Sequence, residues 1–353
     1  MGFLLKDGEK RIALGMSGGV DSSVAAALLQ RAGWEVVGVT CVFTSDGWTA
    51  VDDARLACER LGIEHVVRDC RVEFEELVVA PFVRAYVSGL TPSPCVACNA
   101  QVKVPSLMRA ADELGCAYVA TGHYARVARS DEDRWTVVCA EDAAKDQSYM
   151  LAMLAQDQLA RLVLPLGGAT KEQVRALAAE LGMPELAEKP ESQDICFAPS
   201  GYRALLAERG ASFASGPIML DGREVGRHTG LADYTVGQRK GIGVAGPEPY
   251  YVTGKNAALN QLLIGTGEQA RIERVVVGSL NWQAVADLAQ PLEATVKLRY
   301  RSCACPCIIV PGENSRVFVR LAESQPTTAP GQYAVFYRDS TVLGGGMIEE
   351  VCS

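Results

Sequence analysis

The feature that most constrains the fold of this chain is an alternation of apolar strands with amphipathic helices over its first 200 residues. Such an alternation predicts a parallel sheet with helices on both faces. Ligands of these sheets bind outside the carboxyl ends of the strands, so we expect the chemistry at that edge. The predicted strands are 11–16, 34–43, 63–70 and 117–124, and the predicted helices are 22–33, 48–62, 74–89 (interrupted near Pro81) and 105–115.

After residue 203 the helical periodicity stops, and short β-rich runs appear between Gly, Pro and Asp-Gly turns. The pair Asp221-Gly222 is a strong hairpin signal. Regularly spaced short strands are typical of a small barrel or sandwich. We therefore expect an α/β catalytic domain at 1–203, a small β-rich central domain at 204–275 and a C-terminal β-barrel at 276–353.

The chain carries no sign of a membrane segment. No apolar run in it reaches the roughly 18 to 20 residues that cross a bilayer. The apolar stretch near its start is about three residues long, whereas a secretory signal has roughly 7–15. We therefore expect a cytoplasmic protein with no membrane partner.

The net charge of −8 does not by itself indicate a nucleic-acid partner. Residues 1–203 hold 20 basic and 28 acidic side chains, and so account for the whole −8. Phosphate contacts supply most of the affinity for nucleic acids, so a binder of this composition needs local basic patches.

The chain has 12 cysteines. In a reducing cytoplasm they indicate packing, metal binding or catalysis rather than a disulfide framework. Four of them stand in or beside apolar runs, where a thiol acts as a small hydrophobic group. These four are Cys41, Cys70, Cys116 and Cys139.

The sharpest motif is Ser-Gly-Gly-Val-Asp-Ser-Ser at 17–23, between a predicted strand and a predicted helix. Its glycines let the backbone approach phosphate oxygens, and the helix start offers free N–H groups and a partial positive charge. Asp21 is a candidate Mg²⁺ ligand. The alternative is a tight turn with a helix cap. The loop is not a Walker A motif, because the Lys-Ser/Thr ending is missing.

Two cysteine sites stand in loop-like settings. The first is Cys95-x-x-Cys98 in the segment 91–103, and the second is Cys196 in the segment 192–197. A structural zinc half-site is the alternative for the first pair, and it needs a second cysteine group. The only other dense group is Cys303, Cys305 and Cys307, whose role the sequence leaves open.

With the loop, these motifs resemble the tRNA-specific 2-thiouridylase family (MnmA, also TrmU) of the PP-loop ATP pyrophosphatases. The resemblance runs through the whole chain and implies an adenine nucleotide alpha hydrolase-like N-terminal domain. The PP-loop itself is shared with many adenylating enzymes, whereas the cysteine motifs are specific. The matching segments are 15–23, 98–103, 121–124, 145–149, 195–197, 237–241, 299–301, 330–332 and 344–346.

The resemblance implies three sets of site residues. The catalytic residues are Cys98 and Cys196. The ATP-binding residues are Gly15, Met16, Ser17, Gly18, Gly19, Val20, Asp21, Ser22, Cys41 and Gly122. The tRNA-binding residues are Ser93, Pro94, Cys95, His123, Lys145, Asp146, Gln147, Arg299, Tyr300 and Gln332.

The implied reaction adenylates the 2-oxygen of a wobble uridine with ATP and Mg²⁺, and then replaces that oxygen with sulfur. In one version Cys196 carries a persulfide and Cys98 releases the sulfur by forming a disulfide with Cys196. A positive charge from His123 or Lys103 would lower the pKa of the nucleophile. Because the family often has Asp where this chain has Cys95, the second version has Cys95, Cys98 and Cys196 hold a [4Fe–4S] cluster.

The resemblance also implies partners: the tRNAs for Lys, Glu and Gln, and an upstream persulfide carrier or cysteine desulfurase. It implies a monomer. Two alternatives stay open. The first is another PP-loop adenylating enzyme with a small-molecule substrate, which would not need Cys98 or Cys196. The second is a non-catalytic tRNA-binding or sulfur-carrier scaffold, which would release no AMP.

Overall fold

The computed structural model describes residues 10–188, 195–211 and 214–352. The chain divides into two compact units. The first contains 1–78, 96–192 and 340–342, and the second contains 79–95, 193–339 and 343–353. None of the described helices is long and apolar enough to cross a membrane.

The first unit is built on a five-stranded parallel sheet with the strand order β3-β2-β1-β4-β7. Continuous apolar runs form the central strands, as is usual when both faces are covered. The sequence predicted four of the five strands, and the two-residue β7 was too short to give a pattern. The strands are β1 (Arg11–Gly15), β2 (Glu35–Val42), β3 (Glu64–Asp69), β4 (Tyr118–Ala120) and β7 (Leu162–Val163).

The order of these strands defines where a ligand can enter. The chain leaves β1 toward β2 and β3, and then returns to place β4 on the other side of β1. At such a reversal the loops after the two neighbouring strands part, and a crevice opens at their carboxyl ends. The segments that follow β1 and β4 begin at Met16 and Thr121.

Helices cover this sheet, and α1, α2 and α8 share one apolar core with it. α1 packs against α8 and β1, α2 against β2 and β3, and α6 against β1 and β4. The left-handed Gly62 ends α2, as its sequence position predicted. The helices are α1 (Val20–Arg31), α2 (Trp48–Leu61), α6 (Val104–Glu113), α7 (Gln156–Arg161), α8 (Lys171–Glu180) and α9 (Pro184–Glu188), with short turns at Ser45–Gly47 and Ser148–Leu151.

The predicted interruption of the helix near Pro81 is confirmed as a π-helical stretch just before the proline. The helical run consists of α3 (Arg71–Phe74), a π-helical stretch (Glu75–Val79) and α4 (Ala80–Val87). Pro81 lies in the first turn of α4, where proline costs little because its missing N–H would have no partner there. The irregularity precedes the proline rather than following it.

The sequence analysis missed an antiparallel hairpin inside the first unit. β5 (Ala125–Arg129) and β6 (Trp135–Cys139) pair directly after β4, and Val138 of β6 pairs with Thr341. The Thr-Gly-His-Tyr segment therefore connects the end of β4 directly to this hairpin.

The second unit contains a four-stranded sheet with the order β10-β11-β8-β9. Asp221 and Gly222 both have positive φ at the β8–β9 turn, which confirms the hairpin that this pair predicted. Helical structure was expected to stop at residue 203, but one short helix, α10 (Tyr202–Glu208), continues past that position. The strands are β8 (Gly216–Leu220), β9 (Arg223–His228), β10 (Tyr251–Asn256) and β11 (Gln261–Gly265), with a short turn at Leu231–Asp233.

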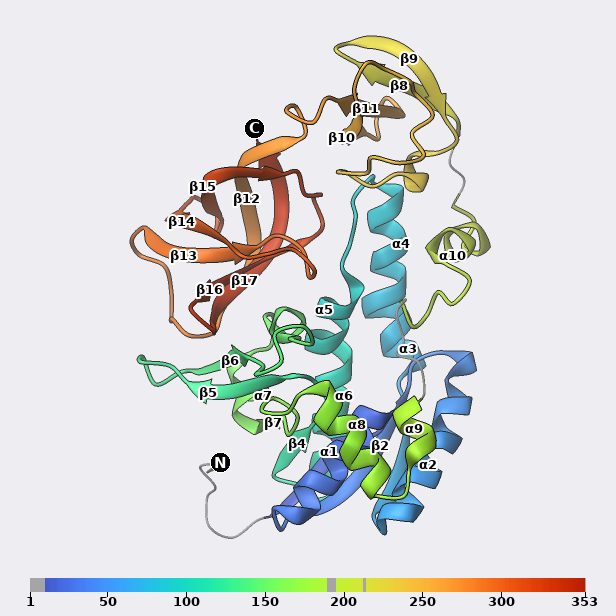
Figure 1. Ribbon diagram of the computed structural model, residues 1–353, viewed down its shortest axis with the longest axis vertical. Helices are drawn as coiled ribbons and strands as arrows, with labels where there is room; N and C mark the ends of the chain where they lie inside the picture. Colours follow the sequence, from blue (N-terminus) through green and yellow to red (C-terminus); the bar gives the residue numbers. More distant parts are fainter. Residues whose placement is uncertain (1–9, 189–194, 212–213, 353) are drawn as a thin grey trace. The chain divides into compact units, whose positions relative to one another are not determined.

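Six further strands form a closed barrel around an apolar core (Figure 1). Their order is β12-β15-β14-β13-β16-β17, and pairing of β12 with β17 closes it. Cys305 and Cys307 are two residues apart on β14 and therefore point to the same face of the strand. Both thiols are buried in the barrel core, while Cys303 is exposed. The strands are β12 (Arg271–Trp282), β13 (Leu292–Lys297), β14 (Cys305–Pro311), β15 (Val317–Pro326), β16 (Tyr333–Arg338) and β17 (Thr341–Cys352).

Candidate functional site

The glycine-rich loop joins the end of β1 to the first turn of α1. Gly18 has φ +70°, and a Cβ there would lie 2.4 Å from the Cβ of Asp53. Gly19 caps the helix, with no side-chain hydrogen bond to the cap. The N-cap residue therefore offers no side-chain acceptor to the first backbone N–H groups of α1, which favours an anion at this helix start.

The serine hydroxyls of the loop hold its shape. Ser22 Oγ and Ser23 Oγ each donate to the carbonyl oxygen of Gly19 at 3.0 Å, and Ser17 lies 3.3 Å from Ser22 Oγ. The alternative of a serine cap at the helix start is wrong, since these hydroxyls bond to a carbonyl instead of the first N–H groups.

The loop after β4 packs directly against the start of α1. A Cβ on Gly122 would lie 3.1 Å from both the carbonyl carbon of Asp21 and the nitrogen of Ser22. Because Gly122 has no side chain, the loops after β1 and β4 can meet at the switch point. This is where we expected both loops from the sequence.

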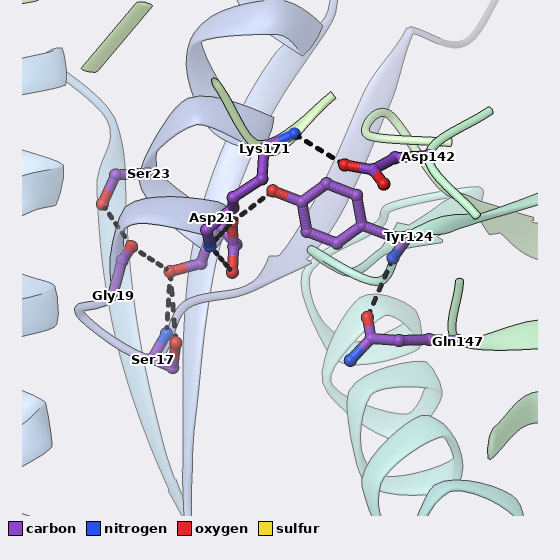
Figure 2. A network of polar contacts seen from close by, with 9 residues as sticks. Ser17, Gly19, Asp21, Ser23, Tyr124, Asp142, Gln147 and Lys171 are labelled. Carbon is purple, nitrogen blue, oxygen red and sulfur yellow. Dashed lines mark hydrogen bonds and ion pairs between the residues drawn. The ribbon is translucent and has the colours of Figure 1, made fainter. Parts of the chain in front are cut away.

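Asp21 makes the densest polar contacts of this region. Its Oδ1 accepts hydrogen bonds from Lys171 Nζ at 2.7 Å and from Tyr124 Oη at 2.7 Å, and its Oδ2 accepts from Lys171 Nζ at 2.9 Å (Figure 2). Both carboxylate oxygens therefore already face a cation. Asp21 does not fit a magnesium ligand in this arrangement, because the metal would have to displace Lys171.

The sequence analysis missed Lys171. It is a buried residue at the first position of α8, and its backbone N–H donates to Asp142 Oδ2 at 3.1 Å. Thr170 and Gln173 form a capping box, which is a readable signal for the helix start. Nothing in the sequence pairs Lys171 with Asp21, since 150 residues separate them.

Three of the expected ATP-binding residues lie at the carboxyl ends of β1 and β2. Met16 is buried, and its carbonyl oxygen accepts from Thr40 Oγ1 at 2.8 Å. Cys41 follows Thr40 near the carboxyl end of β2 and is partly exposed. Gly15 ends β1, beside the strand that carries Cys41. These residues line the same edge of the sheet as the glycine-rich loop.

His123 is held neutral. Burial of its ring, with the positive charge of Lys103, lowers the pKa of His123 to about 3, although part of the residue's surface stays accessible. Thr121 Oγ1 lies 2.7 Å from its Nδ1. The hypothesis that His123 supplies positive charge to a cysteine is therefore wrong, because an imidazole with this pKa carries no proton charge near neutral pH.

Hydrogen bonds fix the loop that contains Lys145–Gln147. Asp146 is buried, and its Oδ1 accepts from the backbone N–H groups of Ala140 and Ser148. Gln147 Oε1 accepts from the backbone N–H of Tyr124 at 2.9 Å (Figure 2). Gln147 N donates back to the Tyr124 carbonyl at 2.8 Å. Lys145 is partly exposed. Gln147 thus connects this loop to the tyrosine that bonds to Asp21.

The first cysteine motif is helical, so the expected loop-like setting is wrong. Cys95 and Cys98 lie on α5 (Pro94–Cys98), which continues into a π-helical stretch (Asn99–Lys103). Cys95 is exposed and Cys98 is buried. Asn99 Nδ2 donates to the Met150 carbonyl at 3.0 Å and anchors this turn. The partly exposed Ser93 and Pro94 lead into α5.

The second cysteine is presented differently. Cys196 is exposed on a turn, and the next residue, Phe197, packs edge-on against Phe82 with ring centroids 5.1 Å apart. The turn is thus anchored beside an exposed thiol. The start of this motif, residues 192–194, lies outside the described residues.

Within the described ranges, no three His, Cys, Asp or Glu side chains gather as they would around a metal ion.

Two of the predicted tRNA residues in the second unit donate hydrogen bonds to backbone carbonyls. Arg299 donates to the Val236 carbonyl at 2.7 Å, and Gln332 Nε2 donates to the Thr91 carbonyl at 2.7 Å. Tyr300, next to Arg299, is partly exposed. Arg299 and Gln332 therefore have a structural role within the unit, whether or not they also contact RNA.

Three family models match the chain. Residues 10–200 match the tRNA methyl transferase HUP domain, 205–266 match the tRNA methyl transferase PRC-barrel domain, and 273–348 match the aminomethyltransferase beta-barrel domain. Together they give a parallel-sheet N-terminal domain, a central PRC-barrel domain and a C-terminal closed barrel, which confirms the predicted fold class.

Curated relatives match over nearly the whole length. The tRNA-specific 2-thiouridylase MnmA of Syntrophotalea carbinolica is 45% identical, covering 98% of this chain and 100% of the relative. The protein of the same name from Chloroflexus aggregans is 45% identical, covering 96% and 98%. The one from Geotalea uraniireducens is 43% identical, covering 96% and 95%.

Proposed function

Because the chain belongs to the family of tRNA-specific 2-thiouridylases, we propose that it uses ATP to replace the 2-oxygen of the wobble uridine of tRNA with sulfur. The observation that carries the proposal is the open start of α1, which lies at the switch point of a parallel sheet between the loops after β1 and β4. This edge attracts a polyphosphate.

ATP would lie along residues 15–22, with its phosphates at the first N–H groups of α1 and its adenine near Cys41 and Gly122. Gly18 and Gly122 support this placement, because neighbouring atoms lie close to both glycines. The backbone of each can therefore approach a ligand with no side chain in between. Preorganised N–H groups stabilise charge that develops as the α-phosphate is attacked.

Lys171 would act as a positioning residue. The carboxylate of Asp21 lies in the first turn of α1, next to the proposed phosphate site, and its bare charge would repel ATP. Lys171 neutralises that charge through two short hydrogen bonds, and the Tyr124 hydroxyl donates a third. The pair thus keeps the helix start attractive to anions without a protein-bound metal ion, and ATP would bring its own Mg²⁺.

The sulfur step would use both motif cysteines. The uridine leaves its stack, which costs a few kcal/mol in a loop, and its 2-oxygen attacks the α-phosphate and releases pyrophosphate. The outer sulfur of a Cys196 persulfide then attacks C2 and expels AMP. Cys98 attacks the Cys196 sulfur, which breaks the S–S bond to the base and leaves 2-thiouridine and a Cys98–Cys196 disulfide. An external thiol reduces that disulfide.

The exposure of Cys196 supports its role as the sulfur acceptor, because a donor protein has to reach the thiol. Ser93, Pro94 and Cys95 would contact the flipped base. The other expected tRNA contacts, His123, Lys145, Asp146, Gln147, Arg299, Tyr300 and Gln332, stay part of the proposal. So do a cytoplasmic monomer, the tRNAs for Lys, Glu and Gln, and a persulfide carrier or cysteine desulfurase as the sulfur source.

The test is an assay with purified protein, ATP, Mg²⁺, unmodified tRNA and a persulfide donor, with AMP, pyrophosphate and the tRNA nucleosides measured by mass spectrometry. We expect 2-thiouridine in step with AMP. Cys303→Ser is a matched control, since Cys303 is an exposed thiol of the barrel. A methylated nucleoside, or AMP release without tRNA, would overturn the proposal. Iron content measured in the same anaerobic preparation decides between the cluster of Cys95, Cys98 and Cys196 and the persulfide relay.

A further inference from the structure

Two cysteines outside the sulfur-transfer motifs face each other at the edge of the parallel sheet. Cys41 of β2 is in register with Arg68 of β3. Cys70 lies two residues after Arg68, and its backbone N–H donates to the Val42 carbonyl at 2.9 Å, so it continues the strand pairing. Residues two apart along a strand share a face. Cys41 and Cys70 are thus diagonal neighbours on one face of the sheet.

The surroundings of the pair stabilise negative charge. Cys70 is buried, and the hydrogen bond from Cys41, then the one from Ser106, lower the pKa of the Cys70 thiol to about 7. Arg109 adds positive charge beside Cys70, and Glu73 opposes it. The hydrogen bond to Cys70, followed by burial, raises the pKa of Cys41. The first proton therefore leaves the pair near neutral pH, and the second stays on it.

Other buried thiols of the described residues behave differently. Burial raises the pKa of Cys58 to about 11 and that of Cys307 to about 12. Those two fit the expectation that a buried cysteine acts as a small hydrophobic group. For Cys41 and Cys70 that expectation was incomplete, because it treated each thiol alone.

We propose that Cys41 and Cys70 form a redox-active dithiol that a peroxide oxidises to a disulfide. Cys41 is partly exposed, so a small oxidant can reach the pair. The sulfur that carries the negative charge attacks one oxygen of hydrogen peroxide, which breaks the O–O bond and gives a sulfenic acid and hydroxide. The second thiol attacks the sulfenic sulfur, and the S–S bond forms as water leaves. The balance is two thiols and one peroxide to one disulfide and two waters.

The disulfide would change the nucleotide edge of the sheet. Cys41 lies on the strand next to β1, and Cys70 precedes the first residue of α3. An S–S bond holds the two sulfurs about 2 Å apart and so constrains the side chain expected beside adenine. The oxidised chain should therefore bind ATP weakly. This consequence rests on the proposed function, whereas the disulfide itself does not.

The disulfide is tested in full-length protein that carries Cys98→Ser and Cys196→Ser, so that the proposed relay cannot exchange with it. The protein is treated with hydrogen peroxide, alkylated, digested and analysed by mass spectrometry. We expect one dominant cross-linked peptide pair joining Cys41 to Cys70, lost after dithiothreitol and absent in a further Cys70→Ser variant. Free, alkylated Cys41 and Cys70 beside oxidised Cys303 would overturn the proposal.

The consequence is tested by ATP binding to the same protein before and after oxidation. We expect affinity to fall about tenfold or more on oxidation, to return with dithiothreitol, and to be insensitive to peroxide in the Cys70→Ser variant. Cys70→Ala gives the same readout if the serine variant does not fold. A disulfide without a change in affinity would overturn the regulatory consequence. Absence of ATP binding in the reduced protein would instead contradict the proposed function.

Discussion

The two sets of residues that the proposed reaction needs are built in opposite ways. The nucleotide end of the first unit is closely packed: Gly18 and Gly122 have no room for a side chain, and Asp21 is held by two partners. The two motif cysteines are not packed together in this way. Cys98 is buried in a helix, whereas Cys196 is exposed on a turn. Neutralising phosphate charge requires fixed groups, whereas receiving sulfur from a donor requires an accessible thiol.

The largest effect should come from the cysteines, and it should separate the two halves of the reaction. Cys98→Ser and Cys196→Ser should each lower 2-thiouridine formation on the order of a thousandfold or more, because a hydroxyl cannot carry or release the sulfur. Both variants should still form a stoichiometric burst of pyrophosphate with ATP and tRNA, measured by rapid quench. Loss of the burst would mean that the cysteines also serve adenylation.

A second effect should follow from the packing of the glycine-rich loop. Gly18→Ala places a methyl group against Asp53 and requires φ +70° of an alanine, so ATP binding should be lost and the free energy of unfolding should fall by about 2–4 kcal/mol. Gly62→Ala is the matched control, because Gly62 has φ +64° but open space around it. That variant should lose only about 1 kcal/mol and keep its ATP affinity. Calorimetric titration and urea unfolding measure both quantities, and equal losses in the two variants would contradict a packing role.

A smaller effect should follow from the ion pair. Lys171→Met leaves the Asp21 charge unbalanced, so ATP affinity should fall about ten- to a hundredfold, while Lys171→Arg should recover part of it. If Lys171 acts by neutralising Asp21, the double variant Asp21→Asn, Lys171→Met should bind ATP more tightly than Lys171→Met alone. Equal weakness of the two would indicate that Lys171 contacts the phosphates itself. Arg175→Gln, at an exposed position of α8, controls for loss of a positive charge.

The smallest effect concerns His123 and pH. Its pKa is lowered to about 3 in the folded chain, whereas an unfolded histidine titrates near 6.5. The unfolded chain therefore binds a proton first, and His123 contributes stability that is present above about pH 6.5 and is lost as the pH falls toward 3. The slope is at most about 1.4 kcal/mol per pH unit. In NMR titration the ring should stay neutral at pH 5, and His123→Gln should flatten the acid side of the stability profile. A His123 ring that titrates near 6.5 would contradict this.

Local patterns predicted much of this molecule. The helix at 48–62 was readable because its apolar spacing and its closing Gly62 are properties of adjacent residues, and the same holds for the turn at Asp221-Gly222. The helix that carries Cys95 and Cys98 was missed because its five residues begin at the second proline of Thr-Pro-Ser-Pro, a segment that favours extended backbone. The β5–β6 hairpin was missed because its strands lack strict alternation of buried and exposed residues.

The sequence by itself determined the parallel sheet, the barrel and the loop at 17–23, because each depends on spacing between near neighbours along the chain. Only the tertiary structure decided that Lys171 neutralises Asp21, that His123 is uncharged, and that Cys41 faces Cys70. The physical reason is the same for all three: charge and pKa depend on burial and on partners through space, and the fold brought those partners together from 20 to 150 residues away.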